Sequence, residues 1–362
     1  MSVLARVGEF FKHIVRWVKT HRLHSILIFG AVLTIGASVT AYMLLNQPMP
    51  KLDTTPIPVK PRPPAPKYYS LLDGTQIPDQ NAAKAPVTAI MIENSPDARP
   101  QSGVKQAQVV YEAIAEGGIT RFLCLYQQNK PQTIGPVRSL RMYYLDWAAP
   151  YQPSIVHVGG SLFSLQQIRN GQYRDIDIEY HNGTSWRAND RAAPHNVYTS
   201  FANLDALNSK LGFTTSEFTS FTRTDGKPVE APNATSISVA ISGPTYNSQY
   251  TYNAATNTYL RSQANAPHTD REDGQIAPSV VIALRVNMSL IMEDGWRQNI
   301  TTTGNGEAQV FQNGTVQTAT WSKADTFSPL VLTGQDGKAI TLNRGQTWIS
   351  AVPTSAGGVT WQ

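Results

Sequence analysis

Three charged residues, Glu112, Glu116 and Arg121, interrupt an apolar stretch of the chain, "VVYEAIAEGGITRFLCLYQ" (residues 109–127). The rest of this stretch is rich in valine, isoleucine, leucine and aromatic residues, which favour β-strands. Charged groups in such a pattern have two interpretations. They form a structural cluster of ion pairs, or they supply carboxylates for proton transfer or for binding hydroxyl groups.

The two glycines after Glu116 separate two β-prone runs and predict a hairpin with a two-residue turn. Closing the hairpin there places Glu112 opposite Leu123. Arg121 is then expected diagonally between Glu112 and Glu116, within reach of both and on the face opposite the core. The expected core face holds Val109, Tyr111, Ala113, Ala115, Thr120, Phe122, Cys124 and Tyr126.

Two arginines lie three residues apart in "GPVRSLRMYYLDWAAPY" (residues 135–151), where Pro136 predicts the start of a helix. Arg138 and Arg141 would share one face of its first turns. Cations at a helix N-terminus oppose the helix dipole, so they need an acidic partner or an anionic ligand. Glu93, Asp97 and the hairpin glutamates are the candidate partners.

Two further segments carry polar residues on predicted loops. "VHVGGS" (residues 156–161) is a glycine turn opening a helix, the general form of an anion site. It does not match the Gly-x-Ser-x-Gly nucleophile motif, and His157 is expected to be a hydrogen-bonded strand residue. "WRANDRAAPHNVYTS" (residues 186–200) brings Arg191 and His195 into a loop that enters a strand. No metal, phosphate-loop or dinucleotide signature is present, and we expect neither metal nor cofactor.

The elements around these residues predict two domains outside a membrane. Residues 68–231 mix strands and helices, which indicates a mixed α/β (α+β) domain. Residues 232–362 carry short strands with turn signals, among them Asn313-Gly314 and Asp336-Gly337, and predict a mostly antiparallel β domain.

The N-terminal region predicts a membrane anchor. Residues 26–45, "ILIFGAVLTIGASVTAYMLL", carry no charge over twenty positions and are long enough to cross a bilayer. We expect a basic cytoplasmic tail (1–24), a transmembrane signal-anchor (25–45) and a proline-rich linker (46–67), with the later domains extracytoplasmic. A signal peptide cleaved after a small-residue site at 39–41 is the alternative.

The charge distribution excludes a nucleic-acid partner for the folded part. The chain of 362 residues has a net charge of +5, but residues 1–24 carry +4 and residues 46–67 carry +3. Residues 68–362 therefore carry −2, and no basic stripe is visible in them. The basic excess belongs to the membrane-flanking segments.

Several long motifs resemble the YerB-like family of bacterial envelope proteins. They are "MIENSPDARPQSGVKQAQVVYEAIAEGGITRFL", "IGPVRSLRMYYLDWA", "VHVGGS" and "RAAPHNVYTS" in the first domain, with "APHTD", "GNGEAQVFQNGTV" and "LNRGQTWISAVP" in the second. The resemblance covers about residues 85–355. It implies a two-domain protein outside the cytoplasmic membrane, usually tethered as a lipoprotein. The only cysteine is Cys124, so the tether expected here is the transmembrane helix.

The resemblance brings no catalytic residues with it, and the first hypothesis is therefore a binding protein. A polar cleft in the α/β domain would recognise peptidoglycan, another wall polymer or an envelope protein. The alternative is a wall-polymer hydrolase or lyase that uses Glu112 or Glu116 as general acid or base. The candidate ligand-binding residues are Glu93, Arg99, Glu112, Glu116, Arg121, Arg138, Arg141, His157, Arg191 and His195.

Overall fold

The computed structural model describes residues 3–48, 66–290 and 297–362 of the chain. The described residues belong to two units, residues 3–48 and the described residues from 66 to 362, and each unit is described by itself. Most of the predicted proline-rich linker, residues 49–65, lies outside the described residues.

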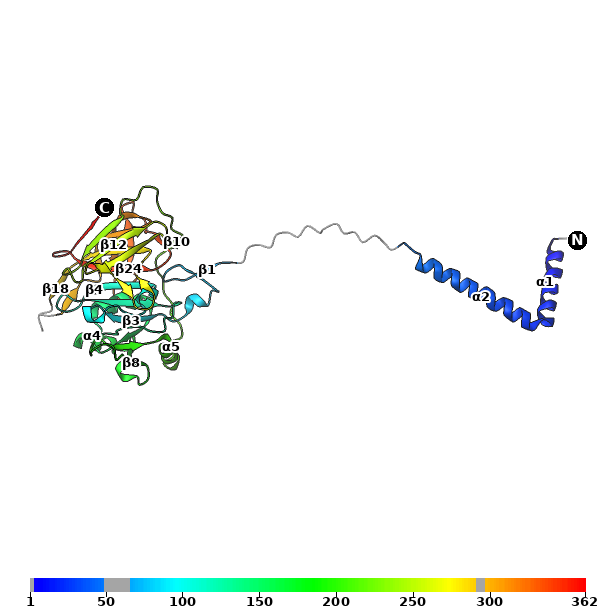
Figure 1. Cartoon of the computed structure of the whole chain (residues 1–362), viewed down its shortest axis with the longest axis horizontal. Coiled ribbons are helices and arrows are strands. Elements are labelled where there is room, and N and C mark those ends of the chain that lie inside the picture. The colour runs from blue at the N-terminus through cyan, green and yellow to red at the C-terminus, as the bar shows by residue number, and fades with distance from the viewer. Residues whose placement is uncertain (1–2, 49–65, 291–296) are drawn as a thin grey trace. The chain divides into compact units, whose positions relative to one another are not determined.

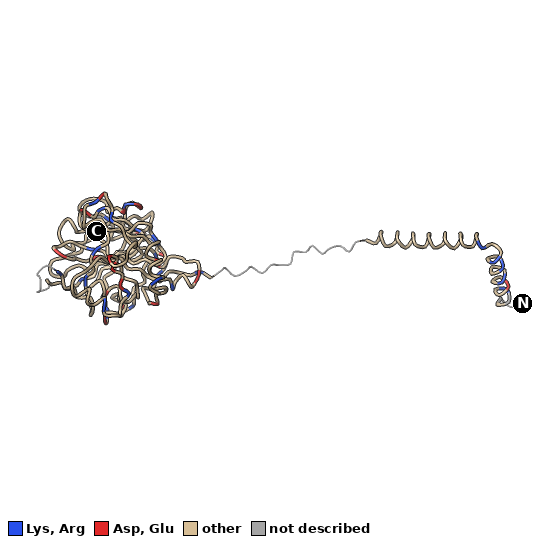
Figure 2. Tube along the Cα trace, turned by 90° about the horizontal axis from the view of Figure 1, so that it is seen from below, with Lys and Arg blue, Asp and Glu red and all other residues tan. Residues whose placement is uncertain are grey.

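The first unit consists of two helices, α1 (Val3–Thr20) and α2 (Arg22–Leu45). Helix α2 is long and apolar enough to cross a membrane. It covers the predicted signal-anchor, residues 25–45, and begins three residues earlier, at Arg22. Figure 2 shows basic residues along α1 and almost none along α2.

The second unit is built on one mixed sheet of ten strands (Figure 1). Its strands in spatial order are β22 (Val331–Gly334), β21 (Thr315–Lys323), β20 (Gly304–Gln312), β17 (Val280–Val286), β24 (Thr347–Pro353), β4 (Val109–Ile114), β5 (Thr120–Tyr126), β3 (Thr88–Glu93), β6 (Ser154–His157) and β7 (Arg174–Asp177). Every residue of β3, β4, β5 and β24 is buried, so these strands have continuous rather than alternating apolar patterns.

Both faces of the large sheet are covered. Helices α3 (Met142–Ala148) and α4 (Leu162–Ile168) pack on one face. Helix α5 (Phe201–Lys210) and a second, antiparallel sheet pack on the other. The strands of that second sheet, in order, are β14 (Ala266–Pro267), β13 (Thr258–Gln263), β12 (Ser248–Asn253), β11 (Ser236–Ala240) and β25 (Gly358–Trp361).

Short elements complete the unit at its edges. The two-stranded pairs are β1 (Tyr68–Tyr69) with β2 (Gln76–Ile77), β8 (Ser185–Arg187) with β9 (Val197–Thr199), β10 (Arg223–Thr224) with β23 (Leu342–Asn343), β15 (Thr269–Asp270) with β16 (Gly274–Gln275), and β18 (Met288–Leu290) with β19 (Gln298–Ile300).

The predicted hairpin exists as β4 and β5, but its register was wrong by one residue. Glu112 pairs with Phe122 and Ala113 with Arg121. The amide of Ala115, not that of Glu116, donates to the carbonyl of Ile119, so two residues oppose one and form a bulge. A shift of one residue moves each side chain to the other face. Glu112 therefore shares its face with Thr120, Phe122 and Cys124, and Arg121 lies on the opposite face.

The helix predicted from Pro136 was also placed too early. Residues 134–140 are extended, and the α3 helix begins at Met142 with Arg141 as its N-cap residue. The backbone of this segment bridges to Ile92 through Val137 and to Gly160 through Leu140. Those sheet-like bonds outweigh the local preference for a helix start after proline. Arg138 consequently lies outside any helix.

Other local predictions are confirmed. Strand β6 is followed by a glycine turn and by α4, whose N-cap Ser161 accepts a hydrogen bond from the Ser164 amide. The predicted strand and helix after His195 are β9 and α5. Asn313 and Gly314, both at positive φ, close the β20–β21 hairpin. The Asp336-Gly337 turn closes a short hairpin in which Ala339 bridges to Thr333 and the amide of Ile340 donates to the carbonyl of Leu332. The chain then leaves this hairpin, and β23 pairs with β10.

The two predicted domains share the large sheet. Strand β24 from the second domain pairs in parallel with β4 from the first, with Ile349 beside Tyr111. The boundary predicted at residues 231 and 232 stays a prediction. This pairing shows that the two predicted domains both contribute strands to one continuous sheet.

Trp348 on β24 is the largest fully buried side chain at this junction, with 0 % of its surface exposed. Trp348→Ala should lower the free energy of unfolding by about 3–5 kcal/mol, because truncation leaves a cavity between the sheets. Urea denaturation of residues 66–362 measures the change. Trp361→Ala is the matched control, since Trp361 is 41 % exposed on an edge strand and should cost less than half as much. Equal losses would contradict this role of Trp348.

Candidate functional site

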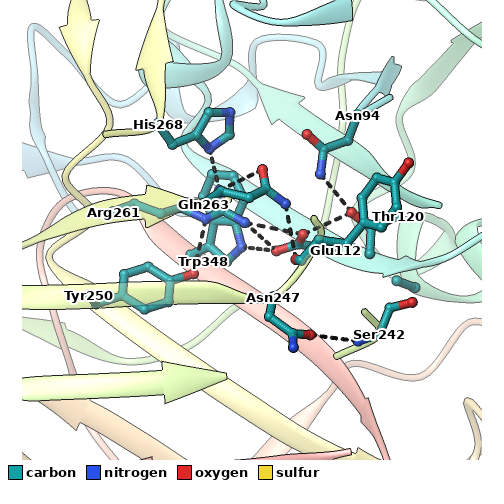
Figure 3. Close-up of polar contacts among 12 residues, drawn as sticks. Asn94, Glu112, Thr120, Ser242, Asn247, Tyr250, Arg261, Gln263, His268 and Trp348 are labelled. Carbon is teal, nitrogen blue, oxygen red and sulfur yellow. Dashed lines mark hydrogen bonds and ion pairs between the residues drawn. The ribbon is translucent and has the colours of Figure 1, made fainter. Parts of the chain in front are cut away.

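A buried ion pair between Glu112 and Arg261 lies between the two sheets (Figure 3). Both side chains have 0 % of their surface exposed. The Arg261 Nη2 atom lies 3.1 and 2.9 Å from the two carboxylate oxygens of Glu112. Trp348 Nε1 and Thr120 Oγ1 also donate to this carboxylate, at 2.9 and 3.1 Å. The carboxylate is therefore fully hydrogen-bonded and closed to solvent.

Polar side chains extend this ion pair across the interior. Arg261 also hydrogen-bonds His268 Nδ1, and His268 Nε2 lies 2.9 Å from Gln101 Oε1. Gln101 donates to Asn94, which donates to Thr120 and so returns to Glu112. Arg99 borders the network through two bonds to Asn94, at 3.1 and 2.8 Å. Burial lowers the pKa of His268 well below 6.5, and the Arg261 and Arg99 charges lower it further.

A second group of charges lies near one end of the large sheet and is called here the arginine–glutamate cluster. Its members are Glu93, Glu116, Arg121, Arg138, Arg141 and His195. All six were predicted from the sequence. Glu93 is the last residue of β3 and is the direct neighbour of Arg121 on β5, so strand pairing places them side by side.

Glu93 organises one half of the cluster. Its Oε1 atom lies 2.9 Å from His195 Nδ1, 3.0 Å from Ser95 Oγ and 3.3 Å from Arg138 Nε. A carboxylate at Nδ1 fixes the orientation of an imidazole ring and leaves Nε2 for another partner. His195 Nε2 lies 3.9 Å from the exposed carboxylate of Asp97.

Glu116 organises the other half from the hairpin turn. It forms ion pairs with Arg141 and with Arg121, whose Nη2 atom lies 3.1 Å from Glu116 Oε2. Arg121 also donates to the carbonyl of Ser139 at 2.7 Å. Burial lowers the pKa of the Arg121 guanidinium, as expected for a cation removed from water. The acidic partner predicted for Arg141 at the start of α3 is therefore Glu116.

One carboxylate oxygen of the cluster has capacity for a further hydrogen bond. The Glu93 Oε2 atom is buried and has no hydrogen-bond partner within the described residues. A buried carboxylate oxygen normally has a donor, so this atom is suited to accept a hydrogen bond from a ligand.

Two of the predicted site residues have structural contacts instead. His157 is a fully buried strand residue, as expected, with its ring nitrogens 2.8 Å from Gly159 O and 2.8 Å from Asp175 Oδ1. Arg191 donates to the carbonyls of Ala98 and Pro100 and so fixes the loop that follows β3.

In the part of the chain that the structure describes, no group of three or more His, Cys, Asp or Glu residues is placed to hold a metal ion.

Arg261 was the main residue that sequence reasoning missed. It lies in β13, where Tyr259, Arg261 and Gln263 are buried and the residues between them are partly exposed. An arginine on the buried face of an alternating strand requires an acidic partner. The alternating pattern of β13 could therefore have predicted a buried arginine that needs a carboxylate. Glu112, the glutamate within the apolar strand β4, is that carboxylate.

Two family models match this chain, one for each of the two domains that share the large sheet. Residues 72–214 match "Protein of unknown function (DUF3048) N-terminal domain", and residues 237–349 match the C-terminal domain of the same family. The chain belongs to this family.

The individual relatives are YerB proteins. The chain is 31 % identical over 294 residues to "Putative lipoprotein YerB" of Bacillus subtilis (strain 168), covering 80 % of this chain and 87 % of the relative. It also matches the crystal structure of the YerB protein from Bacillus subtilis with a TM-score of 0.72 and 28 % identity, covering 81 % of this chain and all of that one. These matches confirm the YerB-like resemblance and the fold class. The lipoprotein name of the relative and the apolar α2 associate the chain with the cell envelope.

The Glu112–Arg261 pair should be costly to break from one side. Arg261→Met leaves a buried carboxylate without its cation and should lower the free energy of unfolding by about 3–5 kcal/mol. Adding Glu112→Gln to Arg261→Met should recover part of that loss. The exposed pair of Lys130 and Asp205 provides the control, because Lys130→Met should change stability by less than about 1 kcal/mol. The assignment fails if both single substitutions cost the same in urea denaturation.

His268 should make the stability depend on pH. The unfolded chain binds a proton at this histidine near pH 6.5, whereas folded His268 stays neutral. The free energy of unfolding should therefore fall as the pH drops below about 6.5, by up to about 1.4 kcal/mol per pH unit. His268→Gln should lose that part of the slope. Denaturation curves recorded between about pH 6.5 and pH 5 compare the two proteins, and identical slopes would exclude His268 as the source.

Proposed function

We propose that the protein is a membrane-anchored, extracytoplasmic envelope protein that binds an anionic wall polymer through the arginine–glutamate cluster. The carrying observation is that Arg121, Arg138 and Arg141 lie together at a partly exposed sheet end, where they pair with Glu93 and Glu116. Guanidinium groups bind phosphate and carboxylate groups through paired hydrogen bonds, which suits polymers that bear such groups.

The position of the cluster in the fold supports this proposal. Strands β3, β6 and β7 run parallel and end at Glu93, His157 and Asp177. In α/β sheets, ligands bind outside the carboxyl ends of such strands. The unpartnered Glu93 Oε2 adds an acceptor for a hydroxyl group of the same ligand. A phosphate-bearing polymer with free hydroxyl groups presents both kinds of group.

The proposed topology places this cluster outside the cytoplasm. Helix α2 would remain as an uncleaved anchor, with the basic residues of α1 on the cytoplasmic side. A wall polymer is then the anionic ligand within reach of the second unit. A partner protein of the envelope with acidic residues is the other candidate ligand.

Hydrolase or lyase activity is a second candidate, favoured by one observation. The Glu93–His195 pair has the geometry of a general base, with a carboxylate at Nδ1 and Nε2 facing other groups. Glu112 is unsuited to this role because no part of it is exposed. Glu116 is partly exposed but is held by two arginines. Release of soluble fragments from labelled wall material tests this candidate, and His195→Gln should abolish that release.

Arg138→Ala and His195→Ala should weaken binding of residues 66–362 to purified wall material by on the order of tenfold each, through loss of a charge-assisted hydrogen bond. Sedimentation with the wall material measures the binding. Because both side chains pair with the buried Glu93, melting temperatures are recorded for each variant, and binding is compared at a temperature where every variant is folded.

The matched control is Arg344→Ala, because Arg344 is 22 % exposed, Arg138 is 23 % exposed, and each pairs with a carboxylate. Its binding should equal that of the unsubstituted protein. Chemical removal of phosphate polymers from the wall material should remove the binding. Equal binding by all three variants, or none by the unsubstituted protein, would exclude the proposal.

A further inference from the structure

Helix α1 has two chemically distinct faces. Val7, Phe10, Phe11, Ile14 and Val18 recur at intervals of three and four residues, which places them on one side of a helix. The exposed apolar side chains of α1 are 41–83 % accessible, and they include Leu4, Val7, Phe10, Phe11, Ile14, Val15, Trp17 and Val18. An exposed apolar stripe of this length requires an apolar partner.

The opposite face of α1 is basic. The helical repeat places Lys12, Arg16 and Lys19 there together with Glu9, and Arg6 at the edge of the apolar face. Glu9 forms an exposed ion pair with Lys12 at 3.0 Å. A net positive face opposite an apolar stripe is typical of helices that lie in the interface of a membrane.

The apolar face of α1 lies toward α2, the predicted membrane span, where the two helices meet. Only His21 separates α1 from α2. Ile14, Trp17 and Val18 of α1 line one hollow of about 1030 Å³ together with apolar residues of α2. The α2 side of this hollow is formed by Ile26, Ile28, Phe29 and Leu33. Lipid around α2 would therefore meet the apolar face of α1 directly.

We propose that α1 lies on the membrane surface, with its apolar face in the boundary between headgroups and acyl chains and its basic face toward anionic lipid headgroups. The inference rests on the proposed retention of α2 as an uncleaved anchor. Continuity with α2 holds α1 at the surface, and each basic residue adds attraction to an anionic leaflet. The occupant of the apolar face is thus phospholipid rather than a second copy of the chain.

Environment-sensitive fluorophores on single cysteines test this arrangement in the full chain. Ile14→Cys places a probe on the apolar face, and Lys12→Cys places the matched control on the basic face. Cys124 does not interfere, because it is fully buried and burial raises the pKa of its thiol. The proteins are reconstituted in vesicles of phosphatidylcholine and phosphatidylglycerol that contain a nitroxide quencher on the lipid acyl chain.

The Ile14 probe should be quenched on the order of threefold more strongly than the Lys12 probe, as expected for a helix sunk to the acyl-chain boundary. Adding Arg16→Glu and Lys19→Glu should reduce quenching of the Ile14 probe to the level of the Lys12 probe. Equal quenching at both positions would overturn the proposal. Quenching that depends on protein density instead of lipid would also overturn it, in favour of pairing between copies. Resistance of the protein to carbonate extraction reports the α2 anchor separately, so failure of the anchor is distinguishable from failure of α1.

Discussion

The ion pair of Glu112 and Arg261 constrains the whole second unit. An unpaired charge at either position would be isolated between two apolar sheets, at a cost of several kcal/mol. Glu112 comes from the first family domain and Arg261 from the second. Neither domain can therefore bury its own charged residue without the other. Trp348 reinforces this dependence, because it donates to Glu112 from the strand that joins the two domains within one sheet.

The same hairpin carries both charge clusters, one on each face. On the interior face, Glu112 is fixed by Arg261, Thr120 and Trp348. The bulge at Ala115 then directs Glu116 to the opposite side, where it meets Arg121 and Arg141. Fixing the strands from the interior reduces the freedom of the outer cluster, and a binding site benefits from such support. The bulge therefore places Glu112 in the closed ion pair with Arg261 and Glu116 in the arginine–glutamate cluster on the other face.

Local sequence signals predicted the elements well and offered the right candidate partners for Arg121, Arg138 and Arg141, but they gave no partner for Glu112. Glycine turns, caps and apolar runs predicted β6 with α4, β9 with α5 and the β20–β21 hairpin, because each depends on a few adjacent residues. The bulge depends on one hydrogen bond at a turn and is invisible in the pattern, yet it moved every side chain of β4 relative to β5. The Glu112–Arg261 pair joins residues 149 positions apart. Only an arginine on the buried face of β13 indicated that such a partner was needed. The six residues of the arginine–glutamate cluster were predicted to lie in one cleft, whereas which carboxylate pairs with which arginine depends on the pairing of β3 with β5 and on the bulge.

Glu116 also limits what the proposed site can bind. It already occupies the position of an anion between Arg121 and Arg141, so a ligand has to compete with an internal carboxylate. A ligand with a single negative charge gains little from that exchange, because it replaces one anion by another. A polymer with several charges would also engage Arg138 and His195, which are bound to Glu93. In the proposed site, the internal carboxylate would therefore favour polyvalent anions over small ones, by competition with the ligand.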